Sequence, residues 1–507
     1  MAEGAAAAPA PAREAITTLD LPHEGATDAL GARLARGLAP GAAILLSGGL
    51  GAGKSALARA TIQAALRSDE PVPSPTFTLV QTYEAPGGLA LVHADLYRLG
   101  DPGEIEELGL RDALRGGEAV TLVEWPGRLS EADVPGDRLE VTLEVAGEGR
   151  RATLRATGPR AEALMTEAIR PRADLLDAFV ARAGWTDAER MGLAGDASNR
   201  RYLRLRRTRG STAVLMDAPP ERGEDVRPFA HVTHLLRERG LSAPRVLAGD
   251  PFHGFLLLED LGDDLYAKVC AREPAIGPGL YAAAVDLLHA LRLAPHEADA
   301  LAPYDAATLA SEAALLTDWW MPAAGMEPSP GLREEWLALM GEALADAGAA
   351  QDRSVLVLRD HHAENLLWLP GREGDARVGL LDYQDALTGH PAYDLVSLLE
   401  DARRDVDREL AETMVARFLD RRPELDPAAF RAAYAALGAQ RNAKIVGIFA
   451  RLARRDGKPR YLELVPRVWA HLMHDLRAPG LERLRAFVER HVPAPEAGAL
   501  ARAKGAA

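Results

Sequence analysis

A glycine-rich loop between a buried strand and a helix predicts an α/β P-loop NTPase domain with a mixed sheet in the first third of the 507-residue chain. Beyond about residue 172, a short β-rich stretch followed by a long helical one predicts a bilobal protein-kinase-like α+β phosphotransferase domain. A second group of residues suited to phosphate chemistry lies between residues 360 and 385. We therefore expect two enzyme domains in one polypeptide.

Changes in composition along the chain set the expected domain boundaries. Ala/Pro-rich ends predict a disordered tail at residues 1–13 and a flexible tail at residues 493–507. The strand pattern stops near Gly158, so the P-loop ATPase domain is placed at residues 14–158 and a linker at residues 159–171. The phosphotransferase domain then occupies residues 172–492.

The overall composition is that of a soluble globular protein, with 48% hydrophobic and 26% charged residues. The net charge of −15 argues against a protein that grips nucleic acid over its whole surface, and the first 160 residues are themselves acidic. Any connection with tRNA or DNA would therefore run through a partner protein.

One cysteine, Cys270, excludes an internal disulfide framework and a cysteine-rich zinc site, and it fits a reducing compartment. No apolar run approaches the roughly eighteen residues that span a bilayer. The N-terminal residues lack the basic start and apolar core of a signal peptide. We expect a cytoplasmic protein without a membrane partner.

The glycine-rich loop carries the full Walker A pattern, with a buried strand at residues 42–46 before it and a helix at residues 56–66 after it. Its residues are Gly48, Gly49, Leu50, Gly51, Ala52, Gly53, Lys54 and Ser55. The glycines let successive backbone N–H groups point at phosphate oxygens, and the helix N-terminus adds positive potential. Lys54 would reach the β- and γ-phosphates of ATP, and Ser55 would hold Mg²⁺.

Alternating apolar and helical patterns predict the remaining elements of this domain. Strands are expected at residues 15–19 (an edge strand), 77–83, 89–94, 119–123, 138–145 and 151–156, and helices at residues 27–38 and 104–115.

Three polar positions follow the P-loop helix. Thr76 lies in a hydroxyl-rich loop, residues 74–78, that suits either a switch sensing Mg²⁺ and the γ-phosphate or a serine/threonine turn before a strand. Asp95 follows an apolar run and is placed for a Mg²⁺ carboxylate. Glu124 ends a strand that faces the ligand crevice, where it could orient the attacking water, bind metal or simply cap the strand.

Four linked motifs over about residues 15–157 resemble the TsaE family, the ATPase subunits of bacterial tRNA threonylcarbamoyladenosine biosynthesis. The motifs occupy residues 50–55, 74–77, 93–99 and 123–126. The resemblance implies ATP hydrolysis that resets a complex with two partners, the transferase TsaD and its dimerisation partner TsaB. The modified base is the adenosine beside the anticodon, so this subunit would meet tRNA only indirectly.

The resemblance also implies roles for the matching residues. Lys54 and Ser55 would hold phosphate and Mg²⁺, Thr76 would be the switch position, and Asp95 would be the Walker B carboxylate. Glu124 would be the acid essential for ATP hydrolysis, with Trp125 as its companion near the base or phosphates. Many family members have threonine where Ser55 stands, which keeps the hydroxyl.

The second domain begins with a helix from residue 175, a hairpin of residues 202–205 against 212–216, a helix at 228–239 and a strand at 254–258. It then becomes mostly helical to about residue 490. Two short strands at residues 366–369 and 378–381 would form a hairpin, which brings Asn365 and Asp382 to its open end. Asp360 would accept the proton of the acceptor hydroxyl, while Asn365 and Asp382 hold Mg²⁺.

Other polar residues of this domain have less specific signals. The small polar residues 195–199 suit a loop over phosphates or a plain hairpin turn. Arg200 and Arg201 belong to a basic run that is typical of a solvated face, although one or two arginines could face phosphates. His361 and His362 lack a third ligand at supportive spacing, so we interpret them as loop structure or substrate contacts rather than zinc ligands.

Residues 175–490 resemble the aminoglycoside-phosphotransferase-like kinases, above all their branch of anomeric N-acetylmuramate/N-acetylglucosamine kinases. The resemblance rests on residues 195–202, 215–220, 257–262, 359–366, 382–386 and 393–395. It implies ATP-dependent phosphorylation of a small sugar in cell-wall recycling, with Ser198 near the nucleotide. Leu358 replaces the usual histidine before Arg-Asp, and the strand 212–216 lacks the phosphate-binding lysine, which leaves Arg200 or Arg201 as candidates.

Two alternatives remain open from sequence. The kinase could act on another alcohol, such as an aminoglycoside or choline, because the sequence poorly defines the acceptor pocket. The P-loop domain could instead be a regulatory module that senses ATP and gates the kinase through residues 158–171, although the set of Lys54, Thr76, Asp95 and Glu124 is intact.

Overall fold

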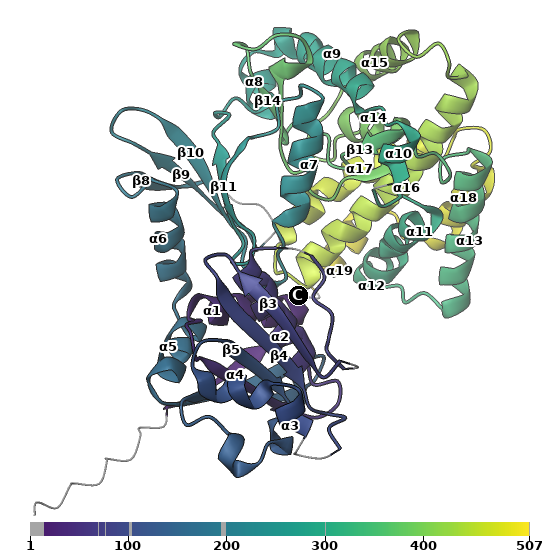
Figure 1. The fold of residues 1–507 in the computed structure, drawn as a ribbon. Coiled ribbons are helices and arrows are strands. Elements are labelled where there is room, and N and C mark those ends of the chain that lie inside the picture. Colours follow the sequence, from purple (N-terminus) through teal and green to yellow (C-terminus); the bar gives the residue numbers. More distant parts are fainter. Residues whose placement is uncertain are drawn as a thin grey trace, which may run out of the picture. The chain divides into compact units, whose positions relative to one another are not determined.

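The computed structural model describes residues 15–68, 70–76, 78–100, 104–193, 199–299 and 301–505. The chain divides into two compact units, one made of Met1–Arg227 with Val246–Asp260 and the other of Pro228–Arg245 with Leu261–Ala507 (Figure 1). The first unit therefore holds the P-loop domain together with the small β-rich part of the second domain. The expected residues of the phosphate loop at 195–198, Ser198 among them, lie outside the described residues.

The P-loop domain is built on a seven-stranded sheet in the order β1-β7-β6-β2-β5-β4-β3. Its strands are β1 (Ala15–Leu21), β2 (Ala43–Gly48), β3 (Val80–Ala85), β4 (Leu89–Asp95), β5 (Val120–Glu124), β6 (Arg138–Ala146) and β7 (Gly149–Thr157). The pairs β2–β5, β2–β6 and β4–β5 are parallel, whereas β1–β7, β6–β7 and β3–β4 are antiparallel. The predicted mixed sheet, including its edge strand β1, is confirmed.

Helices cover both faces of this sheet because successive strand residues point to opposite sides. Ile44 and Leu46 share a core cluster with α1 (Glu24–Arg36), α2 (Lys54–Leu66) and α5 (Pro159–Ala168). Leu45 belongs to the cluster beneath α3 (Glu104–Glu107) and α4 (Leu110–Gly116). The expected helix at 104–115 is interrupted at Gly109, whose φ of 66° is left-handed.

Residues 159–168 correct one expectation, because they are not a linker. They form α5, whose Ala161, Leu164 and Ala168 are buried in the core of the P-loop domain. The pattern of buried residues at i, i+3 and i+7 follows one face of a helix. The P-loop domain therefore extends ten residues beyond the boundary that the sequence predicts.

The small lobe of the second domain is a five-stranded antiparallel sheet in the order β11-β12-β10-β9-β8. Its strands are β8 (Glu189–Leu193), β9 (Arg201–Arg206), β10 (Thr212–Asp217), β11 (Val246–Asp250) and β12 (Phe255–Glu259). Helix α6 (Arg172–Arg182) packs Phe179 against Phe255 of β12, with ring centroids 5.5 Å apart. Strands β8 and β11 were not predicted, since each has only five residues and carries a glycine.

The second unit is mainly helical and contains two small antiparallel hairpin-like sheets. The sheets pair β13 (Val355–Val357) with β16 (Leu387–Gly389) and β14 (Leu366–Trp368) with β15 (Val378–Leu380). The helices are α7 (Arg227–Glu238), α8 (Tyr266–Arg272), α9 (Gly277–Leu287), α10 (Pro295–Asp299), α11 (Ala306–Leu315), α12 (Met321–Ala323), α13 (Pro330–Asp346), α14 (Ala392–Leu399), α15 (Arg408–Asp420), α16 (Pro427–Arg454), α17 (Val465–Asp475), α18 (Glu482–His491) and α19 (Ala497–Gly505). No helix among the described residues is long and apolar enough to cross a membrane.

The C-terminal segment corrects a second expectation. Residues 493–505 are not a flexible tail, because α19 packs Ala499 and Ala503 into the helical unit. The indole N–H of Trp320 donates to the carbonyl of Pro493 at 2.8 Å, and Arg502 Nε donates to the carbonyl of Ala324 at 2.6 Å. These contacts fix the segment to the neighbourhood of α12.

Candidate active sites

The loop between β2 and α2 has the backbone geometry of a phosphate cradle. Gly53 caps α2 with a left-handed φ of 101°. A Cβ on Gly48 would lie 2.4 Å from the carbonyl oxygen of Leu143, so only glycine fits there. Gly49 and Gly51 face open space instead, since an added Cβ would meet nothing within 4 Å. The loop is thus fixed at its base and open along the rim where phosphates would approach.

Lys54 is buried at the start of α2, and its ammonium group turns into the loop. Its Nζ donates to the carbonyls of Gly48 and Gly49 at 2.9 and 2.8 Å and lies 3.9 Å from the centre of the Trp125 ring. Burial lowers the pKa of Lys54, while the negative charges of Glu124 and Asp95 act to raise it. A desolvated ammonium group in a glycine-rich cradle suits the phosphates of a nucleotide.

Glu124 is held from two sides at the end of β5. Its Oε2 accepts a hydrogen bond from Ser55 Oγ at 2.7 Å, and its Oε1 lies 2.9 Å from Nε2 of the buried His93. The carboxylate itself is only 1% exposed. The structure thus brings the predicted residues Ser55 and Glu124 together and adds His93, whose position two residues before Asp95 on β4 puts both on one face of the strand.

Asp95 pairs with Glu124 in the register of the parallel strands β4 and β5. Its Oδ2 accepts a hydrogen bond from Thr76 Oγ1 at 3.2 Å, and its Oδ1 accepts one from the Tyr97 amide at 3.1 Å. The predicted switch residue therefore touches the predicted metal carboxylate. Ser55 and Asp95, the two residues predicted to hold Mg²⁺, carry the oxygen donors that this ion prefers.

One further contact to the loop escaped the sequence analysis. Arg150, near the start of β7, donates from Nη2 to the carbonyl of Gly51 at 3.1 Å. Arg150 lies about a hundred residues from the loop in sequence, and only the pairing of β6 with β7 brings it there. No motif around Arg150 indicates this contact.

The catalytic loop of the second domain, between β13 and β14, is anchored by Asp394 of α14. The buried carboxylate accepts hydrogen bonds from the amides of Leu358 and Arg359 at 2.6 and 2.9 Å. Burial raises the pKa of Asp394 to about 7, although these two hydrogen bonds act to lower it. Because the backbone amides of residues 358 and 359 make these hydrogen bonds, the contact with Asp394 does not require a histidine side chain at position 358.

Asp360, Asn365 and Asp382 are arranged as predicted. The amide of Leu381 donates to the carbonyl of Asn365 at 2.9 Å, which extends the β14–β15 pairing and puts Asn365 and Asp382 at the same end of the hairpin. Asn365 Nδ2 donates to the carbonyl of Asp360 at 3.0 Å. Asp382 has a φ of 56°, a strained backbone of the kind that is common at functional sites.

Positive charges surround Asp360, which is exposed at the surface of its loop. Loss of solvation within the protein acts to raise the pKa of the Asp360 carboxyl. The positive charges of Lys444, Arg441 and Arg359 outweigh this effect and hold the pKa below its usual range. Glu312 of α11 orients two of these cations, since it pairs with Arg359 and lies 2.9 Å from Lys444 Nζ. No sequence motif indicates Glu312, which lies far along the chain from each of them.

His361 and His362 are buried within the loop. His361 Nε2 lies 3.2 Å from the carbonyl of Ala284, and His362 Nε2 lies 3.1 Å from Arg403 Nη1. Burial lowers the pKa of each imidazole to about 4, so both are neutral at pH 7. The described residues contain no group of three histidine, cysteine or carboxylate side chains that could hold a metal ion.

The two arginines proposed for phosphate contact are both ion-paired in the small lobe. Arg200 Nε lies 2.7 Å from Glu224 Oε2, and Arg201 Nε donates to Oδ2 of the buried Asp217 at 3.0 Å. These ion pairs do not test a contact with phosphate, so the predicted role of the two arginines stays a prediction.

Comparison with known families divides the chain in the same way. The family of threonylcarbamoyl adenosine biosynthesis protein TsaE matches residues 21–153, and the phosphotransferase enzyme family matches residues 189–432. The TsaE of Rickettsia felis is 40% identical over 133 residues, which cover 26% of this chain and 75% of that protein.

Two relatives of the second domain are N-acetylmuramate/N-acetylglucosamine kinases. The kinase of Caulobacter vibrioides is 41% identical over 350 residues, covering 62% of this chain and 95% of that protein. The kinase of Pseudomonas putida is 35% identical over 303 residues, covering 58% of this chain and 86% of that protein.

Proposed function

Because this chain belongs to the TsaE family in its N-terminal part and to the N-acetylmuramate/N-acetylglucosamine kinases in its larger part, we propose that it is a bifunctional enzyme. The P-loop domain is an ATPase for tRNA threonylcarbamoyladenosine modification, and the second domain transfers phosphate from ATP to the anomeric hydroxyl of an amino sugar. The observation that carries the proposal is the presence of two separate, internally connected sites, one around Glu124 and one around Asp360.

In the ATPase, Lys54 and the loop amides bind the phosphates, and Ser55 and Asp95 are the residues that would hold Mg²⁺. That ion would supply positive charge against the charge that develops on the phosphate oxygens. Glu124 orients the attacking water and accepts its proton, and the contact with His93 at 2.9 Å fixes the carboxylate for this task. Thr76 joins the switch loop to Asp95, and Trp125 packs over Lys54.

In the kinase, Asp360 accepts the proton of the sugar hydroxyl as the phosphate is transferred. Its lowered pKa keeps it ionised at neutral pH, which positions and polarises the hydroxyl. Asn365 and Asp382, at the end of the β14–β15 hairpin, are the residues that would hold Mg²⁺ there. Ser198, Arg200 and Arg201 are proposed for the nucleotide phosphates in place of the missing lysine.

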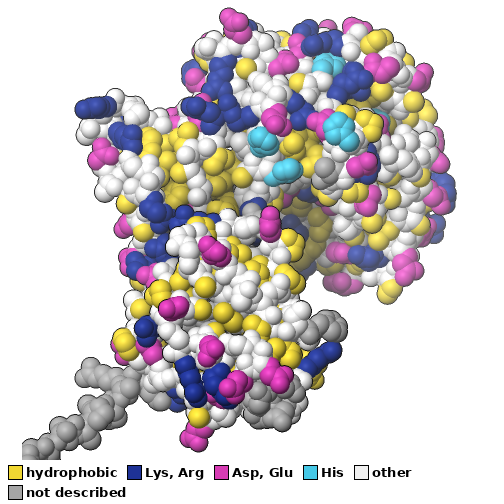
Figure 2. All heavy atoms as spheres, in the orientation of Figure 1, with side chains coloured by type: hydrophobic (Ala, Val, Ile, Leu, Met, Phe, Trp, Pro, Cys, Tyr) yellow, Lys and Arg dark blue, Asp and Glu magenta, His cyan; other side chains and the backbone are white. Residues whose placement is uncertain are grey.

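The partners of the ATPase would be TsaD- and TsaB-like proteins, in the cytoplasm, with tRNA reached through them. On the face drawn in Figure 2, basic and acidic side chains are interspersed and form no extended basic field. The net charge of −15 agrees with contact through proteins rather than directly with tRNA. The kinase would serve peptidoglycan recycling.

The acceptor is tested by assaying the purified full-length chain with ATP and N-acetylmuramate, N-acetylglucosamine, choline or an aminoglycoside. We expect turnover of the two amino sugars and a product that is acid-labile, because anomeric phosphates hydrolyse readily. Turnover of the aminoglycoside or choline alone would overturn the proposed substrate class.

A further inference from the structure

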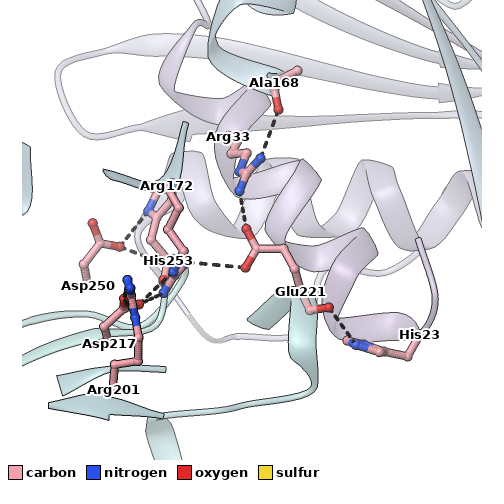
Figure 3. Close-up of polar contacts among 9 residues, drawn as sticks. All are labelled: His23, Arg33, Ala168, Arg172, Arg201, Asp217, Glu221, Asp250 and His253. Atoms are coloured by element: carbon pink, nitrogen blue, oxygen red, sulfur yellow. Dashed lines mark hydrogen bonds and ion pairs between the residues drawn. The ribbon is translucent and has the colours of Figure 1, made fainter. Parts of the chain in front are cut away.

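The first unit contains a direct contact between the P-loop domain and the small kinase lobe (Figure 3). The contact joins the start of α1 to the segment 220–224, whose first three residues form the short 3₁₀ helix η3 (Pro220–Arg222). A Cβ on Gly25 would lie 3.0 Å from the carbonyl oxygen of Pro220. His23 Nε2, just before α1, lies 3.1 Å from the carbonyl oxygen of Glu221. The two domains thus meet at backbone distance.

The carboxylate of Glu221 is shared between the two domains. Its Oε1 forms an ion pair with Arg33 of α1, and Arg33 also donates to the carbonyl of Ala168 at the end of α5 at 3.3 Å. Its Oε2 accepts from Nη1 of Arg172, the first residue of α6, at 3.3 Å. All three charged side chains are partly shielded from solvent, which strengthens such pairs relative to fully exposed ones.

Arg172 carries the connection into the small sheet. Its Nε donates to Asp217 Oδ1 at 2.7 Å, and its guanidinium group lies 4.4 Å from the centre of the Phe255 ring. The other oxygen of the buried Asp217 binds Arg201, the first residue of β9. Figure 3 shows Arg172 and Arg201 converging on Asp217 from the two sides.

The same segment also holds the two residues before β9. Glu224 accepts the amide of Asn199 at 3.1 Å and pairs with Arg200 Nε at 2.7 Å. Asn199 Nδ2 donates to the carbonyl of Arg222 at 3.1 Å. Residues 199–201 are therefore all anchored to residues 217–224, and they directly follow the stretch that we assign to the nucleotide phosphates.

On its other side, α1 is locked against the P-loop helix. A Cβ on Gly31 would lie 2.6 Å from the Cβ of Ala60 on α2, the helix that begins with Lys54. Next to the contact lies a cavity of about 560 Å³ lined by residues such as Asp28, Gln63 and Arg227. Across the junction, the described contacts of the 217–224 segment with the P-loop domain are those at His23, Gly25 and Arg33.

We propose that α1 is a docking element for the small kinase lobe and that Glu221 is a positioning residue, which fixes residues 199–201 for the kinase nucleotide. The proposal rests on the proposed kinase function. Its consequence is that the KM of the kinase for ATP depends on a side chain of the ATPase domain. The value of kcat should depend on it far less, because Asp360 and its supporting residues belong to the other unit.

The test compares three single variants and one double variant of the full-length chain in sugar phosphorylation. Arg33→Ala and Glu221→Gln should each raise the KM for ATP about three- to tenfold and leave kcat within about twofold of wild type, as loss of one shielded ion pair implies. The double variant should have nearly the same KM for ATP as Glu221→Gln alone, because both substitutions remove the ion pair between Arg33 and Glu221. The matched control is Arg36→Ala, since Arg36 pairs with Glu167 within the P-loop domain at 3.1 Å; its KM should be unchanged.

Hydrogen exchange gives a readout that does not require kinase turnover. Amides of residues 199–206 should exchange faster in Arg33→Ala than in wild type and at the wild-type rate in Arg36→Ala. A wild-type chain without amino-sugar kinase activity would contradict the proposed function. The hydrogen-exchange comparison would still decide whether the contact at Arg33 fixes residues 199–206. The proposal would be overturned if Arg33→Ala had the same exchange rates and the same KM for ATP as the wild type. It would also be overturned if Arg33→Ala and Arg36→Ala changed these quantities equally.

Discussion

At the scale of single residues, the proposed role of Glu124 requires its carboxylate to be held in one orientation, and His93 is one of the two side chains that contact it. Replacing His93 by alanine should lower the kcat of ATP hydrolysis about tenfold and change nucleotide affinity little, because Lys54 and the loop remain intact. Steady-state ATPase kinetics with a nucleotide-binding titration measure the two effects separately.

His93→Gln provides the matched control for this prediction. A glutamine amide can donate to Glu124 Oε1 in the same place, so it should recover part of the activity that alanine loses. If His93→Ala hydrolyses ATP at the wild-type rate, Glu124 needs no orienting partner and the assignment of His93 is wrong.

The buried imidazole of His361 predicts a dependence of stability on pH. Its pKa is about 4 in the folded chain and near 6.5 when unfolded, so between these values the unfolded state binds more protons. The free energy of unfolding should therefore fall as pH drops from about 6.5 to about 4, by up to about 3 kcal/mol from this group.

Chemical denaturation of the wild type and of His361→Gln at several pH values isolates this contribution, because other titrating groups are common to both. The difference in unfolding free energy between the wild type and His361→Gln should shrink as the pH falls from about 6.5 to about 4. A constant difference from pH 7 to pH 4 would show that His361 is not held neutral.

Sequence patterns found the motif residues of both sites because strand ends and glycine loops are local signals. The structure connects Ser55 with Glu124, Thr76 with Asp95, and Asp360 with Asn365, contacts that the sequence did not predict. Glu312 was missed because its partners Arg359 and Lys444 lie on other segments, and no local spacing encodes such a contact. His93 was within reach, since strand periodicity puts it beside Asp95.

At the scale of elements, α5 shows how a helix can be mistaken for a connection. Its alanines and a leading proline suit a linker as well as a helix, and only burial of Leu164 distinguishes them. By contrast, the strands of the P-loop sheet were predicted from clear apolar runs and from glycine turns, whereas their order in the sheet was not predicted. The same ambiguity hid α19, which is an alanine-rich segment after two prolines.

Leu164→Ala tests whether α5 belongs to the core. The side chain is fully buried, so its truncation should lower the unfolding free energy of the P-loop domain by about 3 kcal/mol. Thermal unfolding followed by circular dichroism, with loss of ATPase activity as a second probe, measures the effect. Glu162→Ala, on the exposed side of the same helix, should change the unfolding free energy by less than about 0.5 kcal/mol. Equal unfolding midpoints for the two variants would show that α5 is not part of the core.

At the scale of the whole molecule, two phosphate-handling sites with unrelated architecture occupy one chain. One lies on a mixed sheet with helices on both faces, and the other combines a small antiparallel sheet with a helical unit. Because the sites share no residue, each should lose activity without the other when its own carboxylate is replaced. Within the first unit, the contact that we propose to connect them includes Glu221, which should affect nucleotide affinity rather than chemistry.

The most direct test of this account measures both activities on the same purified chain and on two variants. Asp360→Asn should abolish amino-sugar phosphorylation, by at least about a hundredfold, and leave ATP hydrolysis by the P-loop domain unchanged. Glu124→Ala should abolish that hydrolysis and leave sugar phosphorylation unchanged. Loss of both activities in either folded variant would contradict two independent catalytic sites.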